Sequence, residues 1–270
     1  MNEKTIITIG IPVYNGERVI EDRIKQILGQ TFKNFIIIIS DNHSTDKTKE
    51  KCEKLSREDN RIIYFCQEMN RGPDWNTNFV LSKAKTKYFV WAFADDIWSE
   101  NFLEKNINVL ENNNKVVGSI GELKLFHRIS KIENEKSEIK ILENSKKYQY
   151  VHPVSGKLDD KIKFYLNYSM SAIMYAVFRT DKLQKSAAIT FEQSKDHKMW
   201  RMDFACILSI IKEGDLEVIS DAFVYKEINP KSKSVIQYMK KSGYNSLDII
   251  FYNFPFTIWC AKNLGSRIFL

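Results

Sequence analysis

The sequence contains few cysteines, and none of them has the spacing typical of metal ligands or redox pairs. The 270 residues include Cys52, Cys66, Cys206 and Cys260, and no CxxC motif occurs. Because a chain of this length can bury a sizeable core without cross-links, we expect neither a disulfide framework nor a zinc site. We expect all four side chains to be buried and reduced, which fits a cytoplasmic protein.

Long apolar runs are also absent. No run approaches the ~18 residues that a membrane-spanning helix requires. The N-terminal stretch MNEKTIITIGIPVYN leads directly into a strand-like segment and lacks the apolar region of a signal peptide. The expected location is therefore the cytoplasm, either free or peripheral on the inner face of the cell membrane.

Two common nucleotide-binding motifs and a nucleic-acid signature are missing. There is no GxGxxG after the first strand-like run and no GxxxxGK[ST], which disfavours the usual dinucleotide site and a P-loop. The net charge of +7 is spread along the chain without an Arg-rich tract, so we expect no nucleic-acid partner. The charge leaves two interpretations open: a solvated Lys-rich surface, or attraction to an anionic ligand or membrane.

The first hundred residues alternate between strand-like and helix-like segments. Continuous apolar runs predict strands at 5–13, 35–40, 61–66 and 87–93. Helical periodicity predicts a helix at 17–30 that ends at the C-cap Gly29. It also predicts a helix that begins after the N-cap Ser44, and a third helix at 74–84. This βαβ rhythm predicts parallel strands with right-handed crossovers in an α/β sheet.

The second half of the chain is less regular. We predict strands at 116–126, 171–180 and 215–226, and a buried helix at 198–214 that ends at Gly214. The polar segment 127–163 is expected to be a mobile excursion, or one that carries a short hairpin.

The C-terminal segment 233–270 interleaves aromatic and basic residues. This pattern is typical of a helix that contacts an anionic membrane surface. The alternative is that the segment packs on the domain or on another subunit of a homo-oligomer.

Polar residues follow each predicted strand of the first half, where a parallel sheet gathers its ligands. The most prominent are the adjacent carboxylates Asp95 and Asp96, which would repel each other unless a cation or a ligand hydroxyl neutralised them. Oxygen ligands favour Mg2+ or Mn2+. Taken alone, Asp95 and Asp96 are better explained as caps of a helix near 99–107, which has Ser99 as its own N-cap, and Asp41 is equally ambiguous.

The set of motifs, in its order and spacing, decides between these readings. IPVYNGE, SDNHSTDKT, NRGPDWNTN and FADDIW closely resemble the family 2 glycosyltransferases of the GT-A fold. The resemblance is dense from residue 5 to about 110 and weaker at 174–183 and 197–226. It implies a GT-A domain at 1–230, with a nucleotide-sugar half at 1–112 and an acceptor half at 113–230, followed by a helical appendage at 231–270.

The resemblance also implies a site for the nucleotide-sugar. Asp41 would bind the base, Asp95 the ribose and Asp96 the metal ion, Mn2+ or Mg2+. Asn42 stands where the family more often has Asp, and Ala94 stands at the first position of the DxD motif. The implied nucleotide-sugar contacts are Pro12, Val13, Tyr14, Asn15, Glu17, Asp41, Asn42, Asn70, Arg71, Gly72, Asn78, Ala94 and Asp95.

The implied catalytic base is Asp203, with Asp196 as a second candidate. The resemblance implies inverting transfer of a sugar from a nucleotide-sugar, with a UDP-sugar as the expected donor. The expected acceptor is a saccharide or lipid-linked saccharide in bacterial surface-polysaccharide synthesis. A nucleotidyltransferase and a degenerate, non-catalytic transferase domain are the alternatives.

Overall fold

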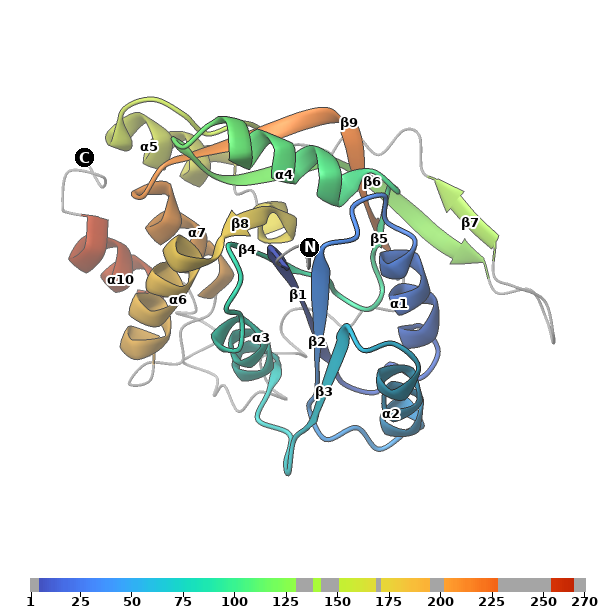
Figure 1. Ribbon diagram of the computed structural model, residues 1–270. Coiled ribbons are helices and arrows are strands. Elements are labelled where there is room, and N and C mark those ends of the chain that lie inside the picture. The colour runs from blue at the N-terminus through green and yellow to red at the C-terminus, as the bar shows by residue number, and fades with distance from the viewer. Residues whose placement is uncertain are drawn as a thin grey trace.

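One sheet forms the centre of the molecule, and both halves of the chain contribute strands to it. The computed structural model describes residues 5–129, 138–141, 151–168, 171–194, 202–227 and 254–264 (Figure 1). In space the strands run β3-β2-β1-β4-β8-β6-β9-β5, and β7 pairs with β6. The strands are β1 Ile7–Val13, β2 Phe35–Asp41, β3 Ile62–Cys66, β4 Tyr88–Trp91, β5 Ile97–Trp98, β6 Val116–Ile129, β7 Glu138–Ile141, β8 Val177–Arg179 and β9 Asp215–Glu227.

The first four predicted strands form the parallel part of the sheet. β1 lies between β2 and β4 and is parallel to both, and β2 is parallel to β3. Pro12 is opposite Ser40, and Asp41 is opposite Val13 on one side and Cys66 on the other. The predicted parallel α/β arrangement is therefore confirmed, and the carboxyl ends of these strands share one edge.

Helices cover both faces of the parallel strands (Figure 1). α1 Ile20–Leu28 and α2 Thr48–Glu58 lie together on one face, and α3 Pro73–Ser82 packs on the other against β1 and β2. Within the described residues, every helix is too short or too polar to cross a lipid bilayer. The remaining helices are α4 Phe102–Asn112, α5 Leu158–Tyr168, a 3-10 helix at Ser171–Tyr175, α6 Thr180–Ser194, α7 Met202–Ile211 and α10 Phe254–Leu264.

The start of α2 differs from the prediction, because Ser44 is not its N-cap. The helix begins at Thr48, whose N–H donates to Asp46 Oδ1 at 3.0 Å. The Ser44 hydroxyl instead accepts the backbone N–H of Asn15 at 2.9 Å. Ser44 therefore joins the loop after β2 to the loop after β1. One prediction about cysteines also fails: Cys66 is exposed, because it ends an edge strand.

The second half contains more regular structure than the sequence indicates. β6 continues to Ile129 and forms an antiparallel hairpin with β7, which agrees with the alternative expected for 127–163, but α5 already begins at Leu158. The strand predicted at 171–180 is mostly wrong. It is a 3-10 helix followed by the short β8, which fits antiparallel between β4 and β6.

Part of the predicted C-terminal appendage packs on the domain. Of residues 233–270, the structure describes 254–264, and these form α10. Phe256 and Trp259 are buried, and the Phe256 ring lies 6.5 Å from that of Phe204 on α7. These two aromatic side chains therefore contact protein. The rest of the segment proposed to contact a membrane lies outside the described residues.

Gly121 of β6 lies at a shift in the register between β6 and β9. A Cβ atom at Gly121 would overlap the backbone carbonyl of Ala222. We expect Gly121→Ala to lower the free energy of unfolding by about 1–3 kcal/mol, measured by urea denaturation, because neither strand backbone can move freely. Gly29→Ala is the control: Gly29 has helical φ at the end of α1 and should tolerate Ala with little change. Equal midpoints for both variants would contradict this prediction.

Candidate functional site

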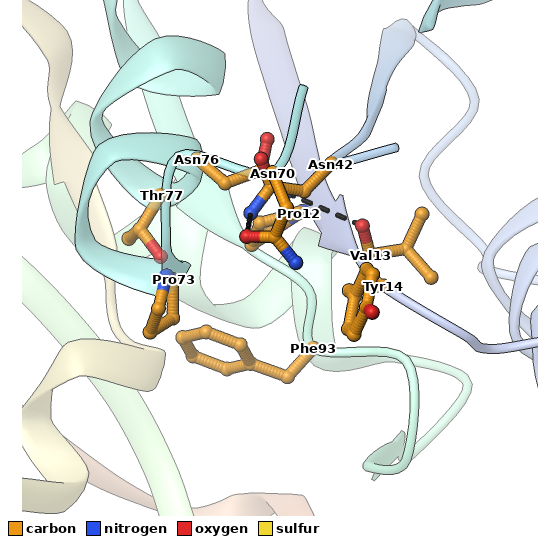
Figure 2. A pocket seen from close by; sticks show the side chains of 9 residues that line it. All are labelled: Pro12, Val13, Tyr14, Asn42, Asn70, Pro73, Asn76, Thr77 and Phe93. Atoms are coloured by element: carbon orange, nitrogen blue, oxygen red, sulfur yellow. Dashed lines mark hydrogen bonds between the residues drawn. The ribbon is translucent and has the colours of Figure 1, made fainter. Parts of the chain in front are cut away.

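A pocket of about 300 Å³ opens at the carboxyl edge of β1 and β2 (Figure 2). Its walls come from the end of β1, from the segment that leads into α3, and from Phe93 after β4. Its volume is at the lower end of the range for small-molecule sites, roughly 300–1,000 Å³. The lining residues are Pro12, Val13, Tyr14, Asn42, Asn70, Pro73, Asn76, Thr77 and Phe93.

The pocket lining combines predicted and unpredicted residues. Five were predicted from the sequence: Pro12, Val13, Tyr14, Asn42 and Asn70. The sequence did not indicate the other four, Pro73, Asn76, Thr77 and Phe93. A usable signal existed for α3, because Pro73 and Thr77 are one turn apart on a helix that starts directly after a predicted binding turn.

Asn76 fixes α3 to the sheet at the base of this pocket. The side chain is buried, and its Oδ1 accepts the Ser40 hydroxyl at 2.5 Å. Its Nδ2 donates to the Ser40 carbonyl at 2.9 Å. The same Nδ2 also donates to the Val13 carbonyl at 3.4 Å (Figure 2). One amide therefore holds the ends of β1 and β2 and the first turns of α3 in a fixed relation.

Asn42 stabilises the turn at 70–72. Its Nδ2 donates to Asn70 Oδ1 at 2.9 Å and to the Gly72 carbonyl at 3.0 Å, while its Oδ1 accepts the Arg71 N–H at 3.0 Å. Gly72 has φ of +86°, which the missing Cβ makes easy. Both amide hydrogens of Asn42 are thus used within the protein. What remains for a ligand is acceptor capacity on Oδ1.

Replacing Asn42 by Asp should disturb this turn more than replacing it by Ala. Asp would place a carboxylate against two acceptor oxygens, Asn70 Oδ1 and the Gly72 carbonyl. We expect Asn42→Asp to cost about 1–3 kcal/mol in the free energy of unfolding. Asn42→Ala, the matched control, removes the contacts without adding repulsion. Urea denaturation of both variants gives the comparison, and an Asp variant as stable as the wild type would contradict it.

Asp41 lies behind the pocket with both carboxylate oxygens engaged. The side chain is fully buried; Oδ1 accepts the Ser44 N–H at 2.8 Å and Oδ2 accepts the Tyr64 hydroxyl at 3.0 Å. Burial, together with the charge of Asp41, raises the pKa of the Tyr64 hydroxyl well above its usual value. Tyr64 therefore remains a donor, and Asp41 is held as an oriented acceptor.

Asn15 and Glu17 connect two loops and do not line the pocket. Asn15 has φ of +52°, and its Oδ1 accepts the Thr45 N–H at 2.9 Å. Glu17 Oε2 accepts the Lys47 N–H at 3.0 Å. These bonds tie the loop after β1 to the segment before α2. The two residues therefore shape the edge of the sheet through the backbone.

The other predicted contacts lie around the pocket. Gly72 is the N-cap of α3, and the Arg71 guanidinium lies over the Trp75 ring at 4.7 Å. Asn78 is half-buried on α3, and Ala94 is half-buried in the turn that follows β4. None of these four predicted residues is in the pocket lining.

The carboxylate pair sits in this turn, and its two members have different surroundings. Asp95 is exposed, whereas Asp96 is 3% exposed. The Asp96 Oδ2 is buried without a hydrogen-bond partner in the described part of the protein. The helix-cap alternative is wrong, because β5 intervenes and α4 begins only at Phe102, after Asn101. Ser99 is not the cap either: its hydroxyl accepts the Phe223 N–H at 2.9 Å.

Burial dominates the electrostatics of Asp96. It raises the pKa of the Asp96 carboxyl to about 7, and the Asp95 charge adds to the rise, while Lys226 and Arg23 oppose it. Arg23 on α1 is itself buried, with its guanidinium 4.1 Å from the centre of the Trp98 ring. Burial lowers the pKa of Arg23 to about 10, against the attraction of the two carboxylates.

The donor set suits a hard divalent cation. Asp95 and Asp96 offer carboxylate oxygens, and the buried, unpartnered oxygen of Asp96 is the observation that fits a bound cation. Within the described residues no group of three or more His, Cys, Asp or Glu could form a complete protein cage. Mg2+ and Mn2+ fit such a site, because they accept one or two carboxylates and take their remaining ligands from water and phosphate.

Tyr175, at the end of the 3-10 helix, links this turn to the second half of the chain. Its ring meets that of Phe93 edge-on at 5.4 Å, and its hydroxyl accepts Lys226 Nζ at 2.5 Å. Burial raises the pKa of the Tyr175 hydroxyl well above its usual value, and Asp96, Asp95 and Asp203 raise it further. The carboxylates of Asp95, Asp96 and Asp203 therefore all lie within electrostatic reach of the Tyr175 phenol.

Asp203 is in the first turn of α7 and is half-buried. Its charge also acts on Asp74, at the start of α3. Asp74 keeps contact with solvent, but the surrounding protein desolvates it enough to raise its pKa, and Asp203 raises that pKa further. The predicted base thus lies within electrostatic reach of Asp74 and of Tyr175. Asp196 lies outside the described residues.

Asp96 should destabilise the metal-free protein at neutral pH. Its carboxyl has a pKa of about 7 in the folded state and an ordinary value of 3.8, so the folded state alone holds its proton between these values. Stability should therefore fall as pH rises from about 4 to 7. In EDTA at pH 8 we expect Asp96→Asn to raise the free energy of unfolding by on the order of 3 kcal/mol.

The control for this prediction is Asp95→Asn, which removes only a neighbouring charge and should give a smaller gain. Urea denaturation at pH 5 and pH 8 measures both variants. A stabilisation by Asp96→Asn that is equal at the two pH values would contradict the role given to ionisation.

Comparison with known proteins identifies the family. Residues 8–156 match the profile of glycosyl transferase family 2. The chain belongs to this family. The predicted resemblance is therefore confirmed.

Curated relatives share between about a quarter and a third of their residues with the chain. WfgD of Escherichia coli, a UDP-Glc:alpha-D-GlcNAc-diphosphoundecaprenol beta-1,3-glucosyltransferase, is 24% identical over 230 residues, which cover 85% of this chain and 79% of WfgD. An uncharacterized glycosyltransferase of Haemophilus influenzae is 30% identical over 151 residues, 56% of this chain and 58% of that protein. GlyG of Streptococcus pneumoniae is 34% identical over 99 residues, which cover 37% of this chain and 33% of GlyG. The chain thus spans a little over half, or less, of these last two relatives.

Solved structures show the same fold. TarS of S. aureus (residues 1–349), in complex with UDP-GlcNAc, matches with a TM-score of 0.60 and 16% identity, over 96% of this chain and 67% of TarS. The mannosyltransferase PcManGT of Pyrobaculum calidifontis, in complex with GDP-Man and Mn2+, matches with a TM-score of 0.56 and 13% identity, over 86% of this chain and 59% of that one. The predicted GT-A fold is confirmed.

Proposed function

We propose that the chain is a metal-dependent, inverting glycosyltransferase. It moves a sugar from a UDP-sugar to a hydroxyl of a lipid-linked saccharide in bacterial surface-polysaccharide synthesis. The observation that carries the proposal is the buried, unpartnered Asp96 oxygen at the same sheet edge as a pocket of nucleoside size. Family membership favours glycosyl over nucleotidyl transfer. The activity of WfgD on a diphosphoundecaprenol-linked sugar supports the donor and acceptor classes.

The pocket would receive the nucleoside. Tyr14 and Phe93 offer aromatic faces, and Asn70 offers an amide beside them. The Asn70 Oδ1 already accepts Asn42 Nδ2 and the Gly72 N–H, so its Nδ2 is the group left to donate to the edge of a nucleobase. Asp41, fixed by Ser44 and Tyr64, lies behind this wall as the base contact that the sequence implies.

The metal ion would be held by Asp96, with Asp95 beside it toward the ribose. When bound, a divalent cation neutralises the negative charge that develops on a diphosphate leaving group. The protein keeps Asp96 available for this role with Lys226 and Arg23, whose charges oppose its protonation. Burial of the Asp96 side chain excludes water around it, which strengthens its electrostatic interactions.

Asp203 would act as the general base. An acceptor hydroxyl is a weak nucleophile, and a carboxylate within reach removes its proton as the new bond forms. Direct displacement by that hydroxyl inverts the anomeric configuration. The half of the chain at 113–230, which carries Asp203, is proposed to bind the acceptor, and the half at 1–112 the donor.

A donor screen with two site variants tests this proposal. We expect UDP-sugars, rather than GDP- or dTDP-sugars, to raise the melting temperature of the wild type, and only with Mn2+ or Mg2+ present. Asp203→Asn should keep this shift but lose about 10²–10⁴-fold in transfer to a prenyl-diphosphate-linked saccharide, because only proton removal is lost. Asp96→Ala should lose both the shift and transfer.

The surface variant Asp221→Asn, whose carboxylate pairs with Lys105, is the control and should behave as the wild type. Unchanged transfer by Asp96→Ala would contradict the metal-dependent mechanism. A donor shift that does not require a divalent cation would contradict it as well.

A further inference from the structure

The outer surface of α3 and the adjoining edge of the sheet carry aromatic, apolar and basic side chains together. Helix α3, with the sequence PDWNTNFVLS, buries Asn76, Val80 and Leu81 against the sheet. These three residues do not cover the opposite face of the helix. We name this surface the α3 patch. Its members are Ile63, Phe65, Met69, Arg71, Trp75, Phe79 and Lys83.

Four members of the α3 patch form a row along the helix. They are spaced four residues apart: Trp75 and Phe79 share one face of α3, whereas Arg71 precedes its N-cap and Lys83 is its C-cap. The Arg71 guanidinium lies 4.7 Å from the centre of the Trp75 ring, and Trp75 stacks on Phe79 at 5.2 Å. Lys83 Nζ lies 5.1 Å from the centre of the Phe79 ring. Two stacked rings thus have a cation at each end.

The edge strand widens this row into a surface. β3 is the outermost strand of the parallel part of the sheet, and its residues alternate between the two faces. Ile63 and Phe65 point to the α3 side, where the Phe65 ring meets Phe79 edge-on at 5.3 Å. Ile63 is 41% exposed, and Met69, after the strand, is 58% exposed. Both are among the few large apolar side chains that the described surface exposes.

The basic members of the α3 patch keep their charge available. Arg71 and Lys83 are exposed, and neither forms an ion pair with a carboxylate in the described part of the chain. Lys87, close by in sequence, is instead neutralised by Glu111 at 2.6 Å. Two exposed carboxylates, Glu68 and Asp74, also border the patch, and desolvation together with Asp203 raises the pKa of Asp74.

We propose that the α3 patch docks the protein onto an anionic lipid surface. Trp, Phe and Met side chains suit the boundary between head groups and acyl chains, and Arg and Lys beside them are attracted to anionic lipids. A second copy of the chain is a poorer occupant. A symmetric contact through this surface would bring Arg71 and Lys83 toward the same cations of the partner.

The position of the α3 patch relative to the pocket explains its use. Asn70 and Pro73 line the pocket, and in sequence they lie between Met69 and Trp75 of the patch. One short segment, residues 69–75, therefore contributes both to the pocket wall and to the docking surface. This inference rests on the proposed function insofar as docking would bring the site to a lipid-linked acceptor.

Vesicle co-sedimentation tests the proposal on the full chain. Vesicles of phosphatidylcholine, with and without phosphatidylglycerol, are mixed with the wild type and with Met69→Ser/Trp75→Ser/Lys83→Glu. The matched control, Ile189→Ser/Tyr168→Ser/Lys54→Glu, makes similar changes at exposed positions on α6, α5 and α2. Lys83→Glu alone serves as a second variant that leaves the apolar packing intact.

We expect the wild type and the control to bind phosphatidylglycerol vesicles, and less so at high salt. The triple patch variant should bind more than about tenfold more weakly, and Lys83→Glu alone several-fold more weakly, because each basic residue at the surface contributes about fivefold. Equal binding by the patch variants and the wild type would overturn the proposal, as would a wild type that does not bind. A dimer in light scattering that only the patch variants lose, with vesicle binding unchanged, would assign the α3 patch to self-association.

The Mn2+-dependent donor shift, measured on the same preparations, separates this inference from the proposed function. A wild type that shows the donor shift but does not bind vesicles overturns the docking surface alone. A wild type that binds vesicles through the α3 patch but shows no donor shift overturns the proposed function alone.

Discussion

The parallel pairing of β1 with β2 and β4 is the constraint on which the site depends. In this register Val13 and Asp41 are neighbours, so the loops that follow the two strands leave the sheet side by side. Those loops are then tied together by Asn15 and Glu17, and α3 is tied to both strands by Asn76. The pocket is the space that remains between groups whose positions the strand ends have already fixed.

The polar groups of the site fall into two classes, and the difference carries the chemistry. Asp41, Asn42 and Asn76 spend most of their hydrogen-bonding capacity on the protein itself, which makes them rigid. Asp96 is buried with an oxygen that nothing in the described structure satisfies. A group in this state costs stability and is retained where a ligand completes it. The hydrogen-bonding groups of the scaffold are thus satisfied within the protein, whereas one oxygen of Asp96 is left for a ligand.

The sequence predicted the parallel half of the fold well, because its strands are continuous apolar runs and its polar strand ends are readable in order. It failed where a residue's role is set by tertiary neighbours. Ser44 and Ser99 look like helix caps, yet their hydroxyls bond to distant backbone groups. Asn76 carries no local signal, because helical periodicity does not show which face of α3 meets a pocket. Phe93, in the loop after β4, carries none either. Asp203 was found through the family resemblance, and its proximity to the carboxylate pair emerges only from the folded chain.

The two halves of the sheet meet through β8, a strand of only three residues. Phe178 in this strand is opposite Phe89 of β4 on one side and Gly118 of β6 on the other. Because β8 forms so few backbone pairs, it places little constraint on the strands beyond it. The parallel half of the sheet, which carries the pocket, is joined in register to the strands beyond β8 through only two residue pairs, Tyr88 with Arg179 and Phe89 with Phe178.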